Sequence, residues 1–287
     1  MAQAGNFGDL PSQYSSIEDA KVVVIPVPYD GTSTWTKGAD KGPAAITEAS
    51  ANMELYDIET DSEVYKQGIF TDEAVEESCS VEEMVEAVRR RVKGHIEEGR
   101  FAVVIGGEHS VSIGAIKAHV ENYGDIMVLQ LDAHTDLREE YNGSKYNHAC
   151  VMARAREVAP ILQVGIRSMD ASEKASLNQA NVFFAKDIID DKDRVEEVVC
   201  KLSDKVYITI DLDVFDPSIM PSTGTPEPGG LLWYDVLGLL TRVFERKDVV
   251  GFDVVELCPN ENNKSPDFLA AKLIYKLLSY KFRGENG

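Results

Sequence analysis

The chain has 287 residues, and 44% of them are apolar, which is enough material for the core of one large domain. It carries 49 acidic against 29 basic side chains, a formal net charge of -20, which argues against nucleic acid or an anionic membrane surface as a partner. No apolar run approaches the ~20 residues of a membrane span, and the first residues lack the features of a signal peptide. The four cysteines form no CxxC pair, so neither a zinc knuckle nor a disulfide scaffold is indicated. We therefore expect a soluble, cytoplasmic protein.

Short apolar runs alternate with amphipathic stretches along the chain. The predicted strands, rich in Val and Ile as buried parallel strands are, cover Val22–Val27, Gln67–Phe70, Phe101–Ile105, Ile126–Leu131, Ile161–Ile166, Val182–Ala185, Val206–Leu212 and Val249–Val255. The predicted helices cover Val81–Glu98, Val111–Val120, Ala149–Val158, Ala171–Gln179, Arg194–Leu202, Leu232–Phe244 and Asp267–Phe282. This alternation predicts an α/β fold with a parallel sheet and right-handed crossovers. Periodicity leaves open whether the sheet closes into a barrel or stays open between two helix layers.

No internal repeat, low-complexity linker or break in composition divides the sequence. We therefore expect one domain over residues 1–287, with residues 1–20 as an N-terminal extension. In a closed barrel and in an open parallel sheet alike, the active site lies at the carboxyl ends of the strands.

Polar side chains lie at the ends of four of the predicted strands or follow them. They are His109, then Asp132, His134 and Asp136, then Asp211 and Asp213, and finally Glu256. Alternate residues of an extended segment point the same way, so two imidazoles and four aspartates converge on one end of the sheet. So many carboxylates repel one another unless cations neutralise them, and two divalent ions do so. The mixed imidazole and carboxylate set suits Mn, Fe, Co, Ni or Zn better than Ca or Mg.

Taken singly, each of these clusters has an ordinary structural interpretation. A DxHxD segment alone could be a helix cap or a surface turn, and a DxD segment in an acidic protein is a weaker signal still. Their joint placement at the carboxyl ends of the strands is what predicts a binuclear metal site.

Three sequence blocks resemble the signatures of the ureohydrolase family, which includes arginases and agmatinases. They are GGEHS, LDAHTD and ITIDLDVFDPSIMPSTGTPEPGG, and the segments GADKGPAAI and GFDVVE resemble further family blocks. The similarity runs from about Val22 to the carboxyl terminus. It implies a three-layer α/β/α sandwich with an eight-stranded, mostly parallel sheet, two Mn²⁺ per subunit and hydrolysis of a guanidino group to urea and an amine. It also implies a homo-oligomer, trimeric or hexameric.

The resemblance further implies the roles of the clustered residues. One metal would be held by His109, Asp132, Asp136 and Asp211, and the other by Asp132, His134, Asp211 and Asp213. Water between two dications loses its proton near neutral pH and can attack the guanidinium carbon. We expect His148 to shuttle a proton to the leaving amine, because the family has a histidine in the corresponding loop. Glu256 is expected to pair with the guanidinium; its alternative role is that of a strand-end cap.

Family members differ in how they hold the tail of the substrate. The block that contains Thr225 and Glu227 resembles the agmatinase form, and we expect both residues to contact the substrate. Glu139, which follows the metal loop, could add negative charge at the pocket mouth. Arg138 stands where arginases have an asparagine that reads a carboxylate, so it is awkward for a purely cationic tail.

The favoured hypothesis is therefore an agmatinase-like enzyme of polyamine biosynthesis that converts agmatine to putrescine, or N1-aminopropylagmatine to spermidine. An arginase or a guanidino-acid hydrolase such as a guanidinobutyrase is the alternative within the family. A deacetylase of the histone-deacetylase type needs one zinc, and the extra ligands His109 and Asp213 argue against it. A non-catalytic, metal-binding regulatory homologue is the alternative of another class. It is disfavoured because all six ligands are present together with His148 and Glu256.

Overall fold

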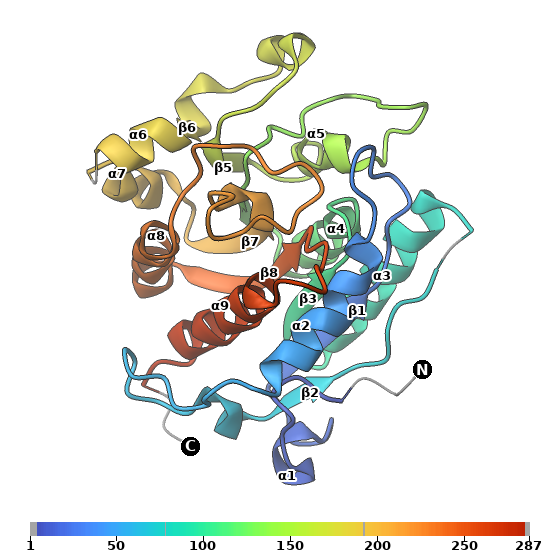
Figure 1. Cartoon of the computed structure of the whole chain (residues 1–287), viewed down its shortest axis with the longest axis vertical. Coiled ribbons are helices and arrows are strands. Elements are labelled where there is room, and N and C mark those ends of the chain that lie inside the picture. The colour runs from blue at the N-terminus through green and yellow to red at the C-terminus, as the bar shows by residue number, and fades with distance from the viewer. Residues whose placement is uncertain (1–4, 78, 192, 285–287) are drawn as a thin grey trace.

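The computed structural model describes residues 5–77, 79–191 and 193–284. Within these residues eight strands form one parallel sheet in the order β2-β1-β3-β8-β7-β4-β5-β6 (Figure 1). The strands are β1 (Val22–Val27), β2 (Ile69–Thr71), β3 (Phe101–Gly106), β4 (Met127–Leu131), β5 (Ile161–Ile166), β6 (Val182–Phe184), β7 (Lys205–Asp211) and β8 (Asp248–Val255). The sheet is open, with β2 and β6 at its edges. This confirms the predicted sandwich and excludes the closed barrel.

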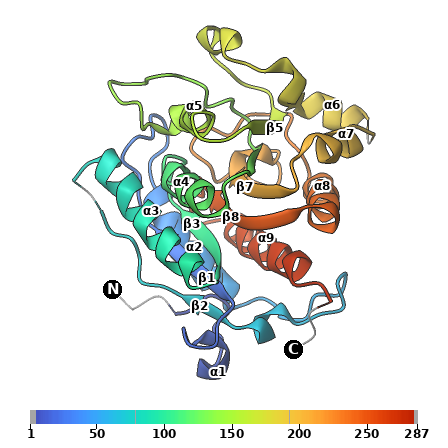
Figure 2. The ribbon, with the colours of Figure 1, turned by 180° about the vertical axis from the view of Figure 1, so that it is seen from behind.

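Helices cover both faces of the sheet. They are α1 (Ser12–Ser15), α2 (Gly42–Ser50), α3 (Val81–Glu97), α4 (Val111–Tyr123), α5 (Val151–Ala155), α6 (Ala185–Asp190), α7 (Asp193–Lys201), α8 (Trp233–Arg246) and α9 (Ser265–Lys281). Helices α2 and α9 lie in front of the sheet in Figure 1, and α3 and α4 lie in front when the molecule is turned around (Figure 2). Two separate apolar clusters result, one on each face.

Strand β1 shows why the predicted strands read as continuous apolar runs. Val22 and Val24 pack into the cluster with α2, α8 and α9, whereas Val23 and Ile25 pack into the cluster with α3, α4 and α5. A strand buried on both faces has no side that favours polar residues, so the period-two alternation of a half-exposed strand is absent. No helix among the described residues is long and apolar enough to cross a membrane.

Three predicted elements differ from the structure near the sheet edges. The strand predicted from Gln67 begins only at Ile69, because Val64–Gln67 forms a 3-10 turn. The helix predicted over Ala171–Gln179 is a 3-10 helix over Ala171–Ala175. It stays short because Glu173 is drawn inward, where its carboxylate accepts hydrogen bonds from the Thr135 hydroxyl and the Leu137 N–H. The segment predicted as helix from Ala149 starts with a 3-10 turn, His148–Cys150, ahead of α5.

The strand order explains how the polar clusters meet. Strands β3, β8, β7 and β4 are consecutive neighbours at the centre of the sheet, and all four are parallel. Their carboxyl ends therefore lie side by side at one edge. These are the four strands that His109, Asp132, Asp211 and Glu256 follow or end.

Candidate metal centre and active site

The first half of the centre is built around His109, just after β3. Its Nδ1 atom lies 3.2 Å from an oxygen of Asp132, 3.1 Å from one of Asp136 and 3.5 Å from one of Asp211. The imidazole is almost fully buried, with 1% of its side chain exposed. These are the four residues that the family resemblance assigns to the first metal.

The second half is built around His134, in the loop after β4. Its Nδ1 atom lies 2.8 Å from Asp213 Oδ2 and 3.6 Å from Asp132 Oδ1. Asp132 thus turns one oxygen toward each histidine. The His134 side chain is 25% exposed, so this half opens toward solvent.

The charges in this cluster show that the residues fit divalent cations. Burial and the Asp132 carboxylate raise the pKa of Asp136 to about 7. Burial and the carboxylates of Asp213 and Asp132 raise the pKa of Asp211 as well. The buried Nδ1 of His109 has no hydrogen-bond partner among the described residues. Transition-metal ions bind carboxylate oxygens and imidazole nitrogens as ligands. Crowded carboxylates and an imidazole nitrogen without a hydrogen bond therefore fit two such ions.

Backbone geometry sets the direction of two site residues. Asp136 and Glu256 adopt positive φ angles of 50° and 70°. Such angles are uncommon for residues other than glycine and concentrate at functional sites. The loop after β4 is tied to the end of β7, because Asp213 accepts a hydrogen bond of 3.0 Å from the Ala133 N–H.

Behind His109 lies a buried polar network that sequence reasoning missed. His109 Nε2 is 2.9 Å from the Thr209 hydroxyl, which donates to Asp253 at 2.6 Å. Tyr207 and Ser112 also donate hydroxyl hydrogens to the Asp253 carboxylate, at 2.6 and 2.9 Å. All of these polar groups are fully buried. A signal was present, since Thr209 and Asp253 are polar residues inside otherwise apolar strands, β7 and β8.

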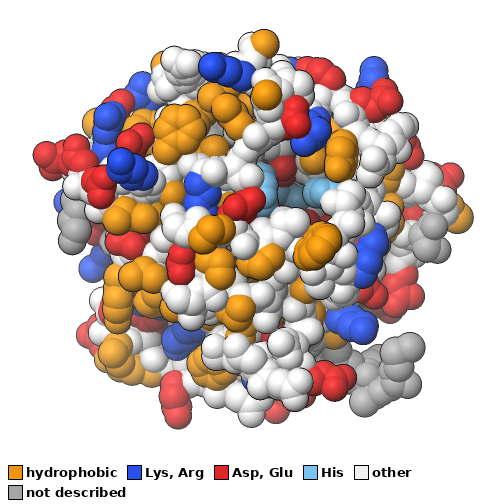
Figure 3. Space-filling model, turned by 45° about the horizontal axis from the view of Figure 1, so that its top comes forward, with side chains coloured by type: hydrophobic (Ala, Val, Ile, Leu, Met, Phe, Trp, Pro, Cys, Tyr) orange, Lys and Arg blue, Asp and Glu red, His pale blue; other side chains and the backbone are white. Residues whose placement is uncertain are grey.

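A pocket of about 320 Å³ opens over the centre. Figure 3 shows histidine side chains in the hollow on this face of the molecule. The predicted site residues that line the pocket are His109, His134, Asp136, Arg138, His148, Asp211, Asp213, Thr225 and Glu256. Asp132 is fully buried beneath it. Glu139 and Glu227 are not part of the lining.

Glu256 and His148 take different positions in this pocket. Glu256 Oε1 accepts the backbone N–H of His109 at 2.8 Å, so the carboxylate is held beside the metal ligands. Burial and the nearby Glu108 carboxylate raise the pKa of Glu256. Burial lowers the pKa of His148 to about 4, and the charges on His109 and His134 act in the same direction.

The residues predicted to hold the substrate tail have other partners in the structure. The Arg138 guanidinium lies 3.4 Å from Asp170 and stacks over the Tyr141 ring at 4.6 Å. Glu139 accepts a hydrogen bond of 2.9 Å from Arg154 and forms a second ion pair with Arg156. These pairs hold the Glu139 carboxylate outside the pocket lining.

Glu227 lies above the open half of the centre. One of its carboxylate oxygens is 3.9 Å from His134 Nε2, on the side of the ring opposite the Asp213 contact. The side chain is 37% exposed. Glu227 therefore contacts the site at His134, and it does not form part of the pocket wall.

Part of the pocket wall was not predicted from the sequence. The loop after β1 contributes Ser33, Thr34, Trp35 and Thr36, and the loop after β5 contributes Met169 and Asp170. Trp35 is 79% exposed at the rim. Both loops follow strand ends, so the rule that found the metal ligands could have found these positions. They were not identified from the sequence, because these loops do not contain the histidine and aspartate pattern of a metal site.

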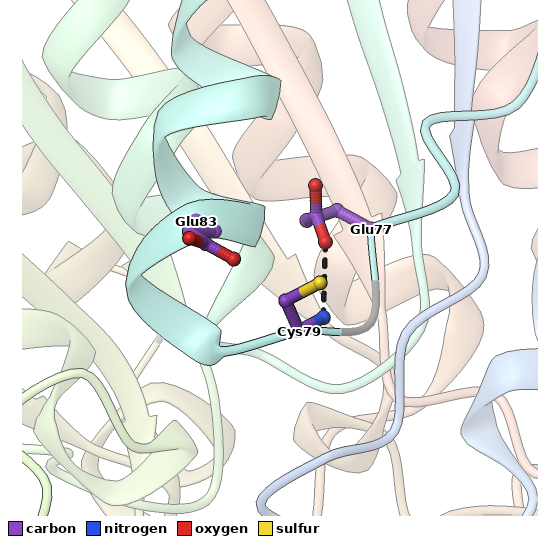
Figure 4. A group of neighbouring side chains, drawn as sticks. All are labelled: Glu77, Cys79 and Glu83. Atoms are coloured by element: carbon purple, nitrogen blue, oxygen red, sulfur yellow. Dashed lines mark hydrogen bonds between the residues drawn. The ribbon is translucent and has the colours of Figure 1, made fainter.

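A second group of possible metal ligands lies outside the lining of this pocket, beside the start of α3. Glu77, Cys79 and Glu83 are close together there, and Glu77 accepts the Cys79 N–H at 2.9 Å (Figure 4). The hydrogen bond to Glu77 and the negative charges of both glutamates raise the pKa of the Cys79 thiol. A protonated thiol is a poor ligand, and the group contains no imidazole. We therefore place the metal centre at the sheet edge and not here.

Comparisons with known proteins agree with this geometry. Residues 20–279 match the Arginase family. The chain is 39% identical to an N(1)-aminopropylagmatine ureohydrolase from Synechocystis, over 98% of this chain and 97% of that protein. It is 32% identical to an agmatinase from Pyrococcus horikoshii, over 93% and 94% of the two chains. The crystal structure of an agmatine ureohydrolase of Thermoplasma volcanium superimposes with a TM-score of 0.88 at 33% identity, covering 99% of this chain and 96% of that one.

The match extends over nearly the whole chain and includes the three blocks that contain the candidate metal ligands. The fold, an open eight-stranded parallel sheet between helices, is shared as well. The protein is a member of the arginase family.

Proposed function

We propose that this protein is a binuclear metal hydrolase that cleaves a guanidino group to urea and an amine. The observation that carries the proposal is the convergence of six potential ligands with His148 and Glu256 around one pocket of about 320 Å³. This combination offers each role that such a hydrolysis requires, namely metal holding, cation binding and proton transfer.

Each half of the candidate centre would bind one metal ion. His109, Asp132, Asp136 and Asp211 would hold one ion, and Asp132, His134, Asp211 and Asp213 the other. When bound, two divalent cations would lower the pKa of a water molecule enough to supply a nucleophile at neutral pH. The buried Asp132 has one carboxylate oxygen near each histidine, which supports a proposed role as a ligand of both ions.

Glu256 is proposed to bind the guanidinium. A guanidinium is a planar cation with several N–H donors, and a carboxylate is its natural partner. The Glu256 side chain is held by the His109 N–H and lines the pocket, so a guanidinium paired with it would lie beside the ligand cluster. Orientation of this kind is the main contribution that a binding residue makes to such a reaction.

His148 is proposed to move the proton. Because its pKa is lowered to about 4, the imidazole is neutral at neutral pH and can accept a proton from the attacking water. The same proton can then pass to the leaving nitrogen, which must be protonated before it departs. His148 lines the pocket without belonging to the ligand cluster, as this role requires.

The tail of the substrate is proposed to be an amine, as in agmatine or N1-aminopropylagmatine. The positive charge of Arg138, the one feature against such a tail, is paired with Asp170 and stacked on Tyr141. A paired guanidinium repels a second cation far less than a free one. Glu227, beside His134, adds negative charge at the open side, and Thr225 lines the wall. The names of the two curated relatives favour the same substrates, and the products would be putrescine or spermidine.

A guanidino acid or arginine is the second candidate. It is favoured by a single observation, which is that Arg138 lines the pocket and could bind a carboxylate if it left Asp170.

We further propose two Mn²⁺ per subunit, a homo-oligomer with three or six subunits, and a cytoplasmic location. The donor set supports a transition metal. Ile58 and Tyr234, which are 82% and 73% exposed along one surface groove, support association with another copy. Exposed apolar groups of this size are a frequent mark of contact surfaces. Metal analysis of the purified protein and analytical ultracentrifugation test the first two points, and cell fractionation tests the third.

A urea-release screen tests the function itself. We would measure kcat/KM for agmatine, N1-aminopropylagmatine, arginine and guanidinobutyrate with Mn²⁺ present, using an Asp211→Asn variant as the blank. One of the two amines should lead by at least about tenfold, or ~1.4 kcal/mol of transition-state binding. A lead for arginine or guanidinobutyrate would overturn the proposed tail. If Mn²⁺-loaded protein released no urea from any of the four, the proposed activity itself would be wrong.

A further inference from the structure

Among the described residues, His148 is hydrogen-bonded by one side chain, the Thr32 hydroxyl, which comes from the loop after β1. Thr32 Oγ1 lies 3.0 Å from His148 Nδ1 and accepts the backbone N–H of His148, also at 3.0 Å. The Tyr141 ring meets the imidazole edge to face, with ring centroids 6.1 Å apart. Thr32 does not line the pocket, although the four residues after it do. Thr32 would therefore affect the reaction through the residues that it contacts, and of these His148 lines the pocket.

The hydrogen bonds around Thr32 determine where its hydroxyl hydrogen points. A hydroxyl has one hydrogen to donate and two lone pairs to accept with. The Thr32 hydroxyl also hydrogen-bonds the buried Glu108 side chain. Glu108 accepts from the Ser110 N–H at 2.8 Å and from the Ser110 hydroxyl at 2.7 Å. Because both Glu108 oxygens already accept hydrogen bonds from Ser110, we infer that Glu108 also accepts the Thr32 hydrogen.

The two lone pairs of Thr32 are then left for His148. The backbone N–H of His148 uses one, and the second faces Nδ1. A lone pair can be paired only with an N–H, so the neutral ring must carry its hydrogen on Nδ1. In a neutral imidazole the other nitrogen then holds the free lone pair.

We propose that Thr32 is a positioning residue that fixes neutral His148 as the Nδ1–H tautomer, leaving Nε2 as the atom that accepts and returns the proton. This inference rests on the proposed proton role of His148. In that reaction Nε2 takes one proton from the attacking water, and the ring becomes a cation with two N–H groups. The same proton then passes from Nε2 to the leaving nitrogen, and the Nδ1–H tautomer is restored. Nδ1 donates to Thr32 throughout, so the ring keeps its orientation.

A fixed tautomer keeps Nε2 able to accept a proton. In the opposite tautomer Nε2 would carry a hydrogen and could not accept the proton of the attacking water. An imidazole without its partner at Nδ1 is free to exchange tautomers and to rotate. Holding one nitrogen by hydrogen bonding is the usual way in which proteins assign the roles of the two.

A matched pair of variants tests the inference. Thr32→Val replaces the hydroxyl by a methyl group of similar size, whereas Thr32→Ser keeps the hydroxyl. We would record ¹⁵N NMR spectra of the histidine side chains near pH 7.5 on protein loaded with diamagnetic Zn²⁺, and assign His148 from a His148→Gln variant. Wild type and Thr32→Ser should show the Nδ1–H tautomer, and Thr32→Val should show a mixture or the Nε2–H form. An Nε2–H tautomer in the wild type, or an unchanged tautomer in Thr32→Val, would overturn the proposal.

Kinetics with Mn²⁺ give an independent readout. In Thr32→Val we expect kcat to fall by at least about tenfold, within the range of general acid–base effects, while KM and metal content stay near the wild-type values. Thr32→Ser should retain kcat within about threefold on the same scale. A fall in kcat without a change of tautomer would refute the inference and leave the proposed function standing. Absence of urea release by the wild type would instead refute the function, and the NMR result would still decide the tautomer.

Discussion

The two histidines of the candidate metal centre have the same proposed task and very different surroundings. Each turns Nδ1 toward aspartates at the same sheet edge. Behind His109, the Nε2 atom meets Thr209, and Thr209 donates to the buried Asp253. Behind His134, the Nε2 atom faces a partly exposed Glu227 at 3.9 Å, which is beyond hydrogen-bonding distance. One half of the centre is thus supported by strands and the other by a loop.

This difference indicates that the half around His109 is the preformed part of the site. Thr209 and Asp253 lie on β7 and β8, adjacent central strands whose register pairs these two residues directly. A fully satisfied buried network makes such a group rigid. Glu227, in contrast, belongs to the loop between β7 and α8, where water competes for every contact. The buried half should therefore hold its ion more firmly, and the open half is the one that a substrate can reach.

The largest effect is expected where the two halves share a ligand. Asp211→Asn removes a carboxylate that the family resemblance assigns to both ions, so it should abolish urea release and strip at least one metal. Metal content by mass spectrometry, with circular dichroism to verify folding, measures the outcome. Full Mn content with near-normal turnover would contradict a shared ligand and, with it, the description of one binuclear centre.

A substitution on the pocket wall should impair proton transfer without affecting metal binding in either half. His148→Ala is expected to lower kcat by roughly 10²–10⁴-fold, the usual range for a general acid–base group. Metal content should stay intact, because His148 is not part of the ligand cluster. If kcat fell less than about threefold, well below that range, His148 would not be the shuttle.

The network behind His109 gives the sharpest comparison of the halves. Thr209→Val removes the hydroxyl that joins His109 to Asp253, and loss of such an outer partner typically costs about 10–100-fold in metal affinity. Thr209→Ser keeps the hydroxyl and should restore the affinity. Calorimetric titration with Mn²⁺ measures the dissociation constant of each ion. Equal binding by Thr209→Val and wild type would show that the network contributes packing only.

The sequence predicted the strands and the candidate ligands of both halves, but not the side chains that support them. All eight strands and the ligand clusters could be located, because buried parallel strands read as apolar runs and sites follow their carboxyl ends. The network behind His109 depends on which strands are neighbours. In the sheet β8 lies between β7 and β3, and β3 is far from β8 in the sequence. Hydrophobic periodicity shows where strands lie along the chain but not which strands are neighbours. The partners of Arg138 and Glu139 depend on loop conformation, for which the sequence pattern carries no comparable rule.

The charges of the buried half predict how pH acts on the metal-free protein. Asp136 has a pKa near 7 when folded and an ordinary, far lower value when unfolded, and the pKa of His109 is also raised, by Asp132, Asp136 and Asp211 against the effect of burial. The folded state therefore binds more protons, and stability falls as pH rises. Between pH 6.5 and 8, Tm should drop by at least about 2 °C, the shift that roughly 1 kcal/mol produces in a large domain.

This pH window reduces the effect of two competing groups. Burial lowers the pKa values of His119 and His148 to about 4, so these groups make stability rise with pH, but most of that rise lies below about pH 6.5, the ordinary value for an imidazole. Thermal unfolding followed by circular dichroism in a metal chelator provides the measurement. Asp136→Asn should flatten the slope, and a metal-free protein that grew more stable from pH 6.5 to 8 would refute the assignment of these charges.

The smallest effect is expected in the open half, at Glu227. Its carboxylate is 37% exposed and 3.9 Å from His134 Nε2, so it resembles a surface ion pair more than a buried partner. Such pairs contribute at most about 1 kcal/mol, which corresponds to a loss of no more than about fivefold in metal affinity for Glu227→Gln. The glutamine keeps the size of the side chain and removes only its charge. The test is the same Mn²⁺ titration used for Thr209→Val, in the same buffer and at two salt concentrations, because screening should erase an exposed contribution and leave a buried one. A loss that matches the one in Thr209→Val and persists in high salt would mean that the loop supports His134 as firmly as the strands support His109, and the contrast between the two halves would fail.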